Sequence, residues 1–197
     1  MKMSKTYFNQ AADSWDQQVN HDSEIIKSVI NSLPDYDSPH ILDIGSGTGV
    51  LVSFLKEKYG SDTHITELDF AEKMIEKAKK KHKNFNNINY IVGDIYDYPL
   101  DESSFDLIFC YSVFPHFSDK EKILKKAKSL LKSRGLLIIF HSQSRKYINN
   151  MHQEAGKEVK SDNLPPAKKV IAYGRKFNLL KEKAIDNSNY YLIILKK

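Results

Sequence analysis

An apolar strand that runs directly into a glycine-rich turn constrains this chain more than any other feature of its sequence. Ile41-Leu42-Asp43-Ile44 is followed by Gly45-Ser46-Gly47-Thr48-Gly49, so three of the chain's 8 glycines fall in one turn. Glycine accepts positive φ angles and lets a ligand approach the backbone closely. Apolar residues at helical spacing follow and stop at Gly60. The segment predicts strand, turn and helix, with a turn that either binds a ligand or is merely tight.

The same alternation repeats along the chain. Apolar runs predict further strands over 64–68, 90–92, 105–111 and 136–140, and amphipathic stretches between them predict helices. Two last strands, about 181–186 and 190–196, are separated by only Asn187-Ser188-Asn189, which is too short for a crossover and predicts an antiparallel hairpin. The fold class is therefore α/β: a Rossmann-like, doubly wound, seven-stranded and mostly parallel sheet with a C-terminal antiparallel hairpin.

Helix ends are also marked in the sequence. Asp22 is placed to cap a helix over 23–33, and Ser118-Asp119-Lys120-Glu121 reads as a capping box that opens another helix. Gly135 is expected to close that second helix.

Composition limits the classes of protein that the chain can belong to. Its 197 residues, 41% of them hydrophobic, suffice for one domain, 1–197. No apolar run approaches the roughly 18 residues of a membrane-spanning helix, and no secretory signal is visible. One cysteine, Cys110, cannot form an internal disulfide, so a cytoplasmic location is expected.

The residues after the second strand point to a nucleoside ligand. Asp69 ends that strand, where a carboxylate can accept hydrogen bonds from both hydroxyls of a ribose. The glycine spacing, however, is Gly-x-Gly-x-Gly, with Val50 where a dinucleotide fingerprint needs a third small residue. This departure disfavours a nicotinamide cofactor.

These residues resemble the class I S-adenosylmethionine-dependent methyltransferases. Ile41–Gly49 is similar to the family's first motif, Glu67-Leu68-Asp69-Phe70-Ala71 to its second, and Gly93-Asp94-Ile95 to its third. Phe105-Asp106-Leu107-Ile108 resembles the motif on the fourth strand. The resemblance spans roughly residues 36 to 140, and the family shares the predicted fold.

The resemblance implies S-adenosyl-L-methionine as cofactor and a set of residues around it. Gly45 and Gly47 would face its amino-acid part, Asp69 its ribose, and Asp94 and Ile95 its adenine. The full set of implied cofactor-binding residues is Gly45, Ser46, Gly47, Asp69, Phe70, Met74, Asp94, Ile95 and Tyr111.

Histidines near strand ends are the candidate catalytic residues. Methyl transfer from a sulfonium needs alignment and desolvation, and a base only where the acceptor must lose a proton. His116 and His141 follow the fourth and fifth strands and are the predicted bases, and His152 is a further candidate. Three histidines could hold a metal ion, but no metal is predicted.

Two flanking segments are expected to serve the substrate. Residues 1–33 would form an N-terminal helical cap whose Tyr7, Phe8 and Trp15 either shield the sulfonium or simply pack. Residues 141–165 would be a substrate lid inserted in the fold, with Arg145 pairing an acidic substrate group, or a plain surface helix.

The sequence thus predicts a methyltransferase acting on a small molecule, as a monomer or homodimer without membrane attachment. The net charge of +5 and the lysines of 77–83 leave a nucleic-acid or protein methyltransferase as an alternative. The sequence lacks the dense basic stripe that would favour nucleic acid as partner. A non-catalytic nucleoside-binding domain is the other alternative.

Overall fold

The computed structural model describes residues 5–154 and 162–197, in two compact units. The N-terminal unit ends at Tyr98 and the C-terminal unit begins at Pro99. The strands of the seven-stranded sheet follow the order β3-β2-β1-β4-β5-β7-β6, and β7 is antiparallel to both of its neighbours. The predicted α/β fold class with its terminal hairpin is therefore confirmed.

Three parallel strands form the sheet of the N-terminal unit. They are β1 (His40–Ile44), β2 (His64–Asp69) and β3 (Ile88–Val92). Ile41, Leu42 and Ile44 of β1 are buried, as expected of a strand covered on both faces. Because the strands are parallel, their carboxyl ends lie at one edge, which carries the glycine turn, Asp69 and Asp94.

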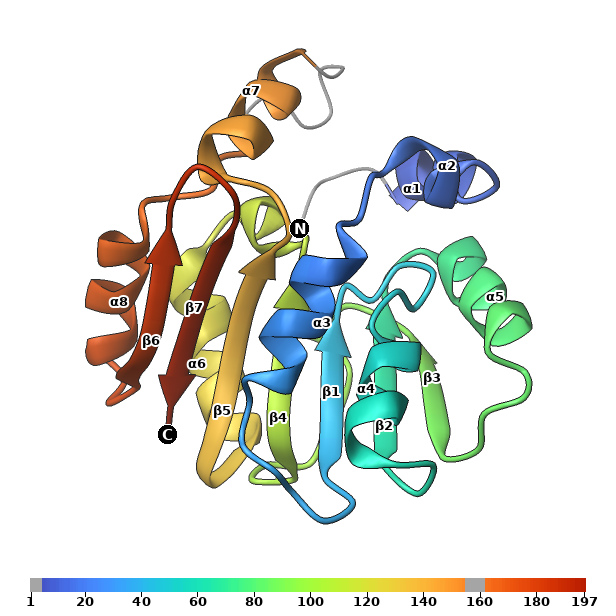
Figure 1. The fold of residues 1–197 in the computed structure, drawn as a ribbon, viewed down its shortest axis with the longest axis horizontal. Helices are drawn as coiled ribbons and strands as arrows, with labels where there is room; N and C mark the ends of the chain where they lie inside the picture. The colour runs from blue at the N-terminus through green and yellow to red at the C-terminus, as the bar shows by residue number, and fades with distance from the viewer. Residues whose placement is uncertain (1–4, 155–161) are drawn as a thin grey trace. The chain divides into compact units, whose positions relative to one another are not determined.

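Five helices complete the N-terminal unit: α1 (Lys5–Ala11), α2 (Trp15–Gln18), α3 (Ser23–Asn31), α4 (Val52–Tyr59) and α5 (Glu72–Lys81). Asp22 caps α3 as predicted, since its carboxylate accepts a hydrogen bond from the Ile25 N–H at 3.0 Å. Gly60 ends α4 with a φ of 89°. Helices α1 and α2 lie beside α5, and the Asn9 side chain accepts a bond from the Lys73 N–H (Figure 1).

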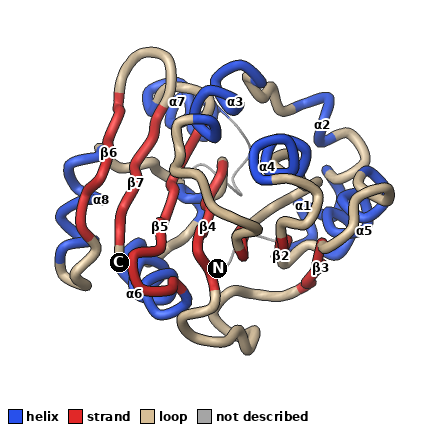
Figure 2. The backbone as a smooth tube through the Cα atoms, turned by 60° about the horizontal axis from the view of Figure 1, so that its bottom comes forward, coloured by secondary structure: helices blue, strands red, loops and turns tan. Residues whose placement is uncertain are grey.

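The C-terminal unit contains the other four strands. β4 (Phe105–Tyr111) pairs parallel with β5 (Leu131–His141), and β7 (Tyr191–Lys196) lies between β5 and β6 (Leu180–Asp186). Figure 2 shows β5, β7 and β6 side by side with the hairpin loop at one end. In that loop the Asn187 carboxamide oxygen accepts bonds from the N–H groups of Asn189 and Tyr190, which fixes the tight turn.

Three α-helices and one short 3₁₀ helix accompany these strands: η1 (Phe114–His116), α6 (Lys120–Leu130), α7 (Arg145–Glu154) and α8 (Ala167–Arg175). Helix α8 packs against β6 and β7 (Figure 2). Helix α7 begins shortly after β5 ends and lies beyond the carboxyl end of that strand (Figure 1).

Two predicted helix ends are wrong. Asp119, not Ser118, caps α6 by accepting a bond from the Lys122 N–H at 2.9 Å, and Glu121 instead pairs with Lys176, which follows α8. Gly135 lies inside β5 and does not end the preceding helix. A Cβ atom at Gly135 would lie 3.0 Å from the carbonyl oxygen of Asp106, so this glycine permits close approach of β4.

Both flanking segments are described in part. Residues 1–4 of the expected cap and residues 155–161 of the expected lid lie outside the described residues. Within the described ranges, the structure has no helix with the length and apolar character needed to cross a lipid bilayer.

Candidate functional site

The glycine turn between β1 and α4 is folded by backbone hydrogen bonds to β2. Gly45, Gly47 and Gly49 have φ angles of 69°, 57° and 75°, a region that other residues adopt at a cost. The N–H groups of Gly45 and Ser46 both donate to the Leu68 carbonyl, at 2.7 and 3.2 Å. The glycines are therefore needed for the path of the backbone, and the turn is held against the end of β2.

Asp69 connects three segments at this edge. Its carboxylate accepts bonds from the N–H groups of Gly47, at 2.9 Å, and Ala71, at 2.8 Å. Its carbonyl accepts a bond from the Gly93 N–H, at 2.9 Å. Asp69, the residue predicted to bind a ribose, thus contacts the glycine turn and lies next to the third motif.

The third motif forms a compact turn after β3. The Asp94 carboxylate accepts a bond from the Tyr96 N–H at 3.0 Å, and its carbonyl accepts from Asp97 and Tyr98. Ile95 is buried, while Asp94 keeps part of its side chain exposed. The structure therefore places Asp94 and Ile95 at the same edge as Asp69, in the same unit.

Aromatic residues of the N-terminal segment pack over α5. Met74 is 1% exposed and lies in a cluster with Ala12 and Ala71, against which Phe8 and Trp15 pack. Phe70 meets Phe8 edge to face, with ring centroids 5.6 Å apart. The indole nitrogen of Trp15 lies 3.8 Å from the position that a Cβ atom would take at Gly47. An aromatic ring thus stands directly beside the glycine turn.

Polar contacts hold the same segment in place. Asp16 accepts a hydrogen bond from the Thr48 hydroxyl at 2.5 Å and from Lys81 of α5 at 2.9 Å. Asp13 pairs with Lys77 of α5 at 2.7 Å. Asp16 therefore ties the N-terminal segment to both the glycine turn and α5.

In the C-terminal unit, a histidine cluster forms around Asp162. The Asp162 carboxylate accepts a hydrogen bond from Nδ1 of His116 at 2.7 Å, and its carbonyl accepts one from Nδ1 of His152 at 3.0 Å. The two imidazole rings lie 5.1 Å apart. Since a carboxylate can only accept, this contact favours the tautomer of His116 that carries its proton on Nδ1.

Asp162 and the position of His152 escaped the sequence prediction. Asp162 follows 46 residues after His116 and sits in a polar stretch without periodicity, so no local signal marks it. His152 and Ile148 are the buried residues of α7. Burial lowers the pKa of His152, with an opposing contribution from the Asp162 carbonyl.

His141 has a different environment from His116. It is 1% exposed, and neither ring nitrogen has a hydrogen-bond partner. Burial, together with His116 and His152, lowers the pKa of His141 to about 3. The imidazole is therefore neutral, and a group with such a pKa is a weak base near pH 7.

Tyr111 ends β4 and faces the residue that follows β5. Its hydroxyl lies 3.0 Å from the Ser142 hydroxyl, and both side chains are buried. Arg145, expected either to meet an acidic substrate group or to lie on a surface helix, instead pairs with Asp186 through Nε at 2.9 and 3.1 Å. Within residues 5–154 and 162–197, no group of three or more His, Cys, Asp or Glu side chains is arranged to hold a metal ion.

Comparison with protein families and curated proteins gives a consistent result. A family model described as "Methyltransferase domain" matches residues 35–191. The chain is 34% identical over 118 residues to a demethylmenaquinone methyltransferase of Thermotoga maritima, covering 60% of this chain and 50% of that protein. It is 29% identical over 162 residues to a malonyl-acyl-carrier protein O-methyltransferase of Bacillus anthracis, covering 79% and 59%. The chain thus spans about half the length of these curated relatives.

The fold is shared with solved structures at low sequence identity. A SAM-dependent methyltransferase from Aquifex aeolicus superimposes with a TM-score of 0.73 at 16% identity, over 99% of both chains. At this identity the likeness shows the fold alone.

Proposed function

Because the chain belongs to the class I S-adenosylmethionine-dependent methyltransferase family, we propose that it transfers a methyl group from this donor to a small-molecule acceptor. Membership confirms the predicted family and, with it, S-adenosyl-L-methionine as the family's cofactor. The acceptor class, the site residues and the location in the cytoplasm belong to the proposal.

The main support for binding of the methyl donor is the contact of Asp69 with the glycine turn. One carboxylate oxygen accepts a bond from Gly47 and the other from Ala71, so the side chain is fixed where the turn approaches β2. A carboxylate oxygen has room for a second donor, such as a ribose hydroxyl. In this proposal Gly45, Ser46 and Gly47 face the amino-acid part, and Asp69 binds the ribose.

The donor supplies an activated methyl carbon, and the acceptor supplies the electron pair. Held by Asp69 and the glycine turn, the donor would give up its methyl group to the acceptor and would be left as S-adenosylhomocysteine. Where the acceptor is a hydroxyl or a protonated amine, its proton goes to Nε2 of His116. Asp162 supports this role because it holds the Nδ1 proton and so fixes the tautomer and ring orientation.

A small-molecule acceptor is supported by the relatives, which are named for a quinone precursor and a carrier-bound acyl group.

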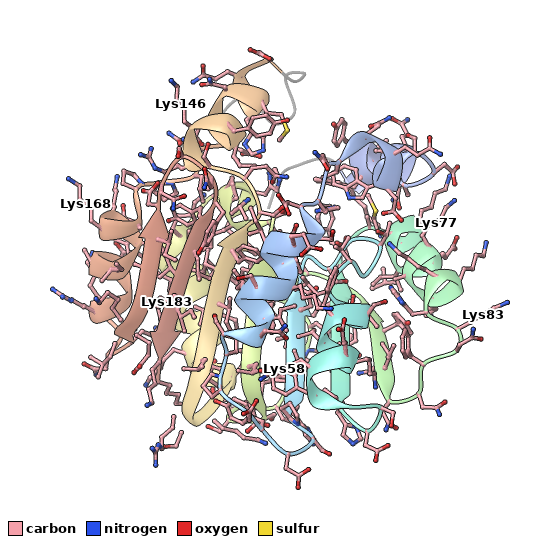
Figure 3. The ribbon with its side chains drawn as sticks, in the orientation of Figure 1. Lys58, Lys77, Lys83, Lys146, Lys168 and Lys183 are labelled. Carbon is pink, nitrogen blue, oxygen red and sulfur yellow. The ribbon has the colours of Figure 1, made fainter. Side chains whose placement is uncertain are left out.

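The alternative of a nucleic-acid or protein substrate is based on the lysines of 77–83. Two of them are already paired within the chain, Lys77 with Asp13 and Lys81 with Asp16. Lys77, Lys83, Lys146 and Lys168, labelled in Figure 3, point outward, which is typical of a solvated surface.

Calorimetric titration with S-adenosylmethionine, S-adenosylhomocysteine and NADH tests whether the chain binds the proposed methyl donor. We expect micromolar binding of the first two and none of NADH. Replacing Asp69 by Ala should weaken donor binding by the order of 1 to 3 kcal/mol, because two ribose hydrogen bonds and the anchor of the turn are lost. Binding of NADH alone would contradict the proposed donor.

Methyl transfer from a methyl-labelled donor to a panel of quinols, amines and carboxylic acids then tests which class of acceptor the protein uses. Once an acceptor is found, His116→Ala should lower kcat by about 10²- to 10⁴-fold while leaving donor affinity unchanged. Donor binding without turnover on any member of the panel would favour the non-catalytic nucleoside-binding alternative.

A further inference from the structure

Two buried carboxyl groups lie side by side beneath the glycine turn, and neither is used in the proposed reaction. Asp43 of β1 and Glu67 of β2 are register partners on neighbouring strands, and they are 1% and 0% exposed. Both oxygens of Glu67, and Oδ1 of Asp43, are buried without a hydrogen-bond partner. Burying a carboxylate without donors is costly, so this arrangement needs a reason.

Glu67 is directed at the turn. Its Oε2 lies 3.2 Å from the position that a Cβ atom would take at Gly49, and Nε2 of His82 lies 3.1 Å from the same point. Nε2 of His82 donates to the Gly49 carbonyl at 2.8 Å, so the neutral ring has no proton on its other nitrogen. The hydroxyl of Ser46, in the same turn, is also buried without a hydrogen-bond partner.

The groups around Glu67 favour its protonated form in the absence of ligand. Burial raises the pKa of Glu67 to about 8; the Ser46 hydroxyl and Lys81 oppose this, and Asp69 adds to it. Burial, with Glu67 and Asp69, raises the pKa of Asp43 as well. On β3, burial and Glu67 raise the pKa of Tyr90, and on the α5 side burial lowers the pKa of His82. The Ser46 hydroxyl and Lys81 are the neighbours that favour the ionised form of Glu67.

We propose that Glu67 senses the charge of the ligand: S-adenosylmethionine binds with release of the Glu67 proton, and ionised Glu67 then favours the donor over the product. The inference rests on the proposed function, which places the donor's amino-acid part on the turn above Glu67. The donor carries a sulfonium, an ammonium and a carboxylate, a net charge of +1, whereas S-adenosylhomocysteine lacks the sulfonium and is neutral overall. A positive ligand stabilises a nearby carboxylate, and loss of that charge on methyl transfer lets the proton return. Release of the product is thereby favoured.

The proton can be counted directly by calorimetry in two buffers that differ in ionisation enthalpy. A donor-induced fall of about one unit in the pKa of Glu67 releases about half a proton at pH 7.5. S-adenosylhomocysteine should release a smaller fraction. Glu67→Gln should abolish the difference between the two ligands, and Glu76→Gln, at an exposed position on α5, should retain it.

A second measurement uses the wild-type protein alone, so it does not require that the Glu67 variant folds. The sulfonium lowers the pKa of the donor's own α-amino group relative to that of the product, so each affinity is first corrected for titration of the free ligand. The corrected ratio of donor affinity to product affinity should then rise roughly six-fold between pH 6.5 and 8.5. A ratio that stays constant with pH, or equal proton release by both ligands, overturns the role of Glu67. Absence of donor binding at either pH would instead contradict the proposed function.

Discussion

At the scale of single residues, two glycines with the same backbone requirement have different surroundings. Gly47 has a φ of 57° and lies under Trp15, whereas Gly60 has a φ of 89° and nothing within 4 Å of its would-be Cβ atom. Replacing either by Ala should cost about 1–3 kcal/mol of stability, because both hold a positive φ angle that a residue with a Cβ atom adopts only under strain. Gly47→Ala alone should also weaken donor binding. Urea unfolding and donor titration of the two variants separate the effects, and equal donor affinity would remove Gly47 from the site.

Protonation of His141 should destabilise the fold in acid. Its pKa is lowered in the folded protein, so the unfolded chain binds the proton more tightly, and stability falls as the pH drops below about 6.5 toward the folded value near 3. Between pH 7 and pH 5 this one residue accounts for about 2 kcal/mol. His141→Leu should flatten the dependence of the unfolding free energy on pH by that amount. An unchanged pH dependence would mean that His141 is accessible to protons while the chain is folded.

At the scale of elements, the short helices α1 and α2 depend on polar contacts for their position. Asp16 binds Thr48 in the glycine turn and Lys81 in α5, while Asp13 binds only Lys77. Asp16→Ala should weaken donor binding about 3- to 10-fold, because the aromatic residues beside the turn lose their tether. Asp13→Ala removes one exposed ion pair and is the matched control, with an expected change below about two-fold. Equal effects of the two variants would speak against a tether at Thr48.

The positions of helices and strands follow from the periodicity of apolar residues. Their ends depend on which side chain takes the capping position and on contacts with other elements, which periodicity does not reveal. The prediction of Asp22 as a cap is correct, since its carboxylate accepts the Ile25 N–H. The prediction of Ser118 as a cap is wrong because Asp119, one position later, takes that role and Glu121 pairs with Lys176 at the end of α8. Gly135 was assigned to a helix end because glycine is common there, whereas its contact with the Asp106 carbonyl arises only once β4 and β5 pair.

At the scale of the whole molecule, the fold was within reach of the sequence, and so were the residues that we propose to bind the donor. The alternation of strands and helices fixes the class of sheet, and the donor motifs are short segments at successive strand ends. The pairing of His116 with Asp162 was out of reach, since it joins residues 46 positions apart through a segment without pattern. Glu67 was visible as part of a motif, yet only the register with Asp43 shows that two carboxyl groups are buried together.

Donor binding should stabilise the folded chain as a whole. At a free concentration of about 100 times the dissociation constant, S-adenosylmethionine should add about 2.7 kcal/mol to the free energy of unfolding. NADH at the same concentration serves as the control and should add nothing. Thermal unfolding with each ligand measures the difference, and equal shifts would show that the stabilisation is not specific.

The lone cysteine of the chain, Cys110, lies in β4 and is 0% exposed. A buried thiol reacts with a maleimide or a disulfide reagent only when its strand opens, so the chain carries a built-in reporter of its own unfolding. Labelling followed by mass spectrometry would give one added mass per opened molecule, with no engineered probe. Where closing is faster than labelling, the rate in native buffer follows the population of the open form, and a ligand that binds the folded chain slows it by the factor 1 + L/Kd, where L is the free ligand concentration.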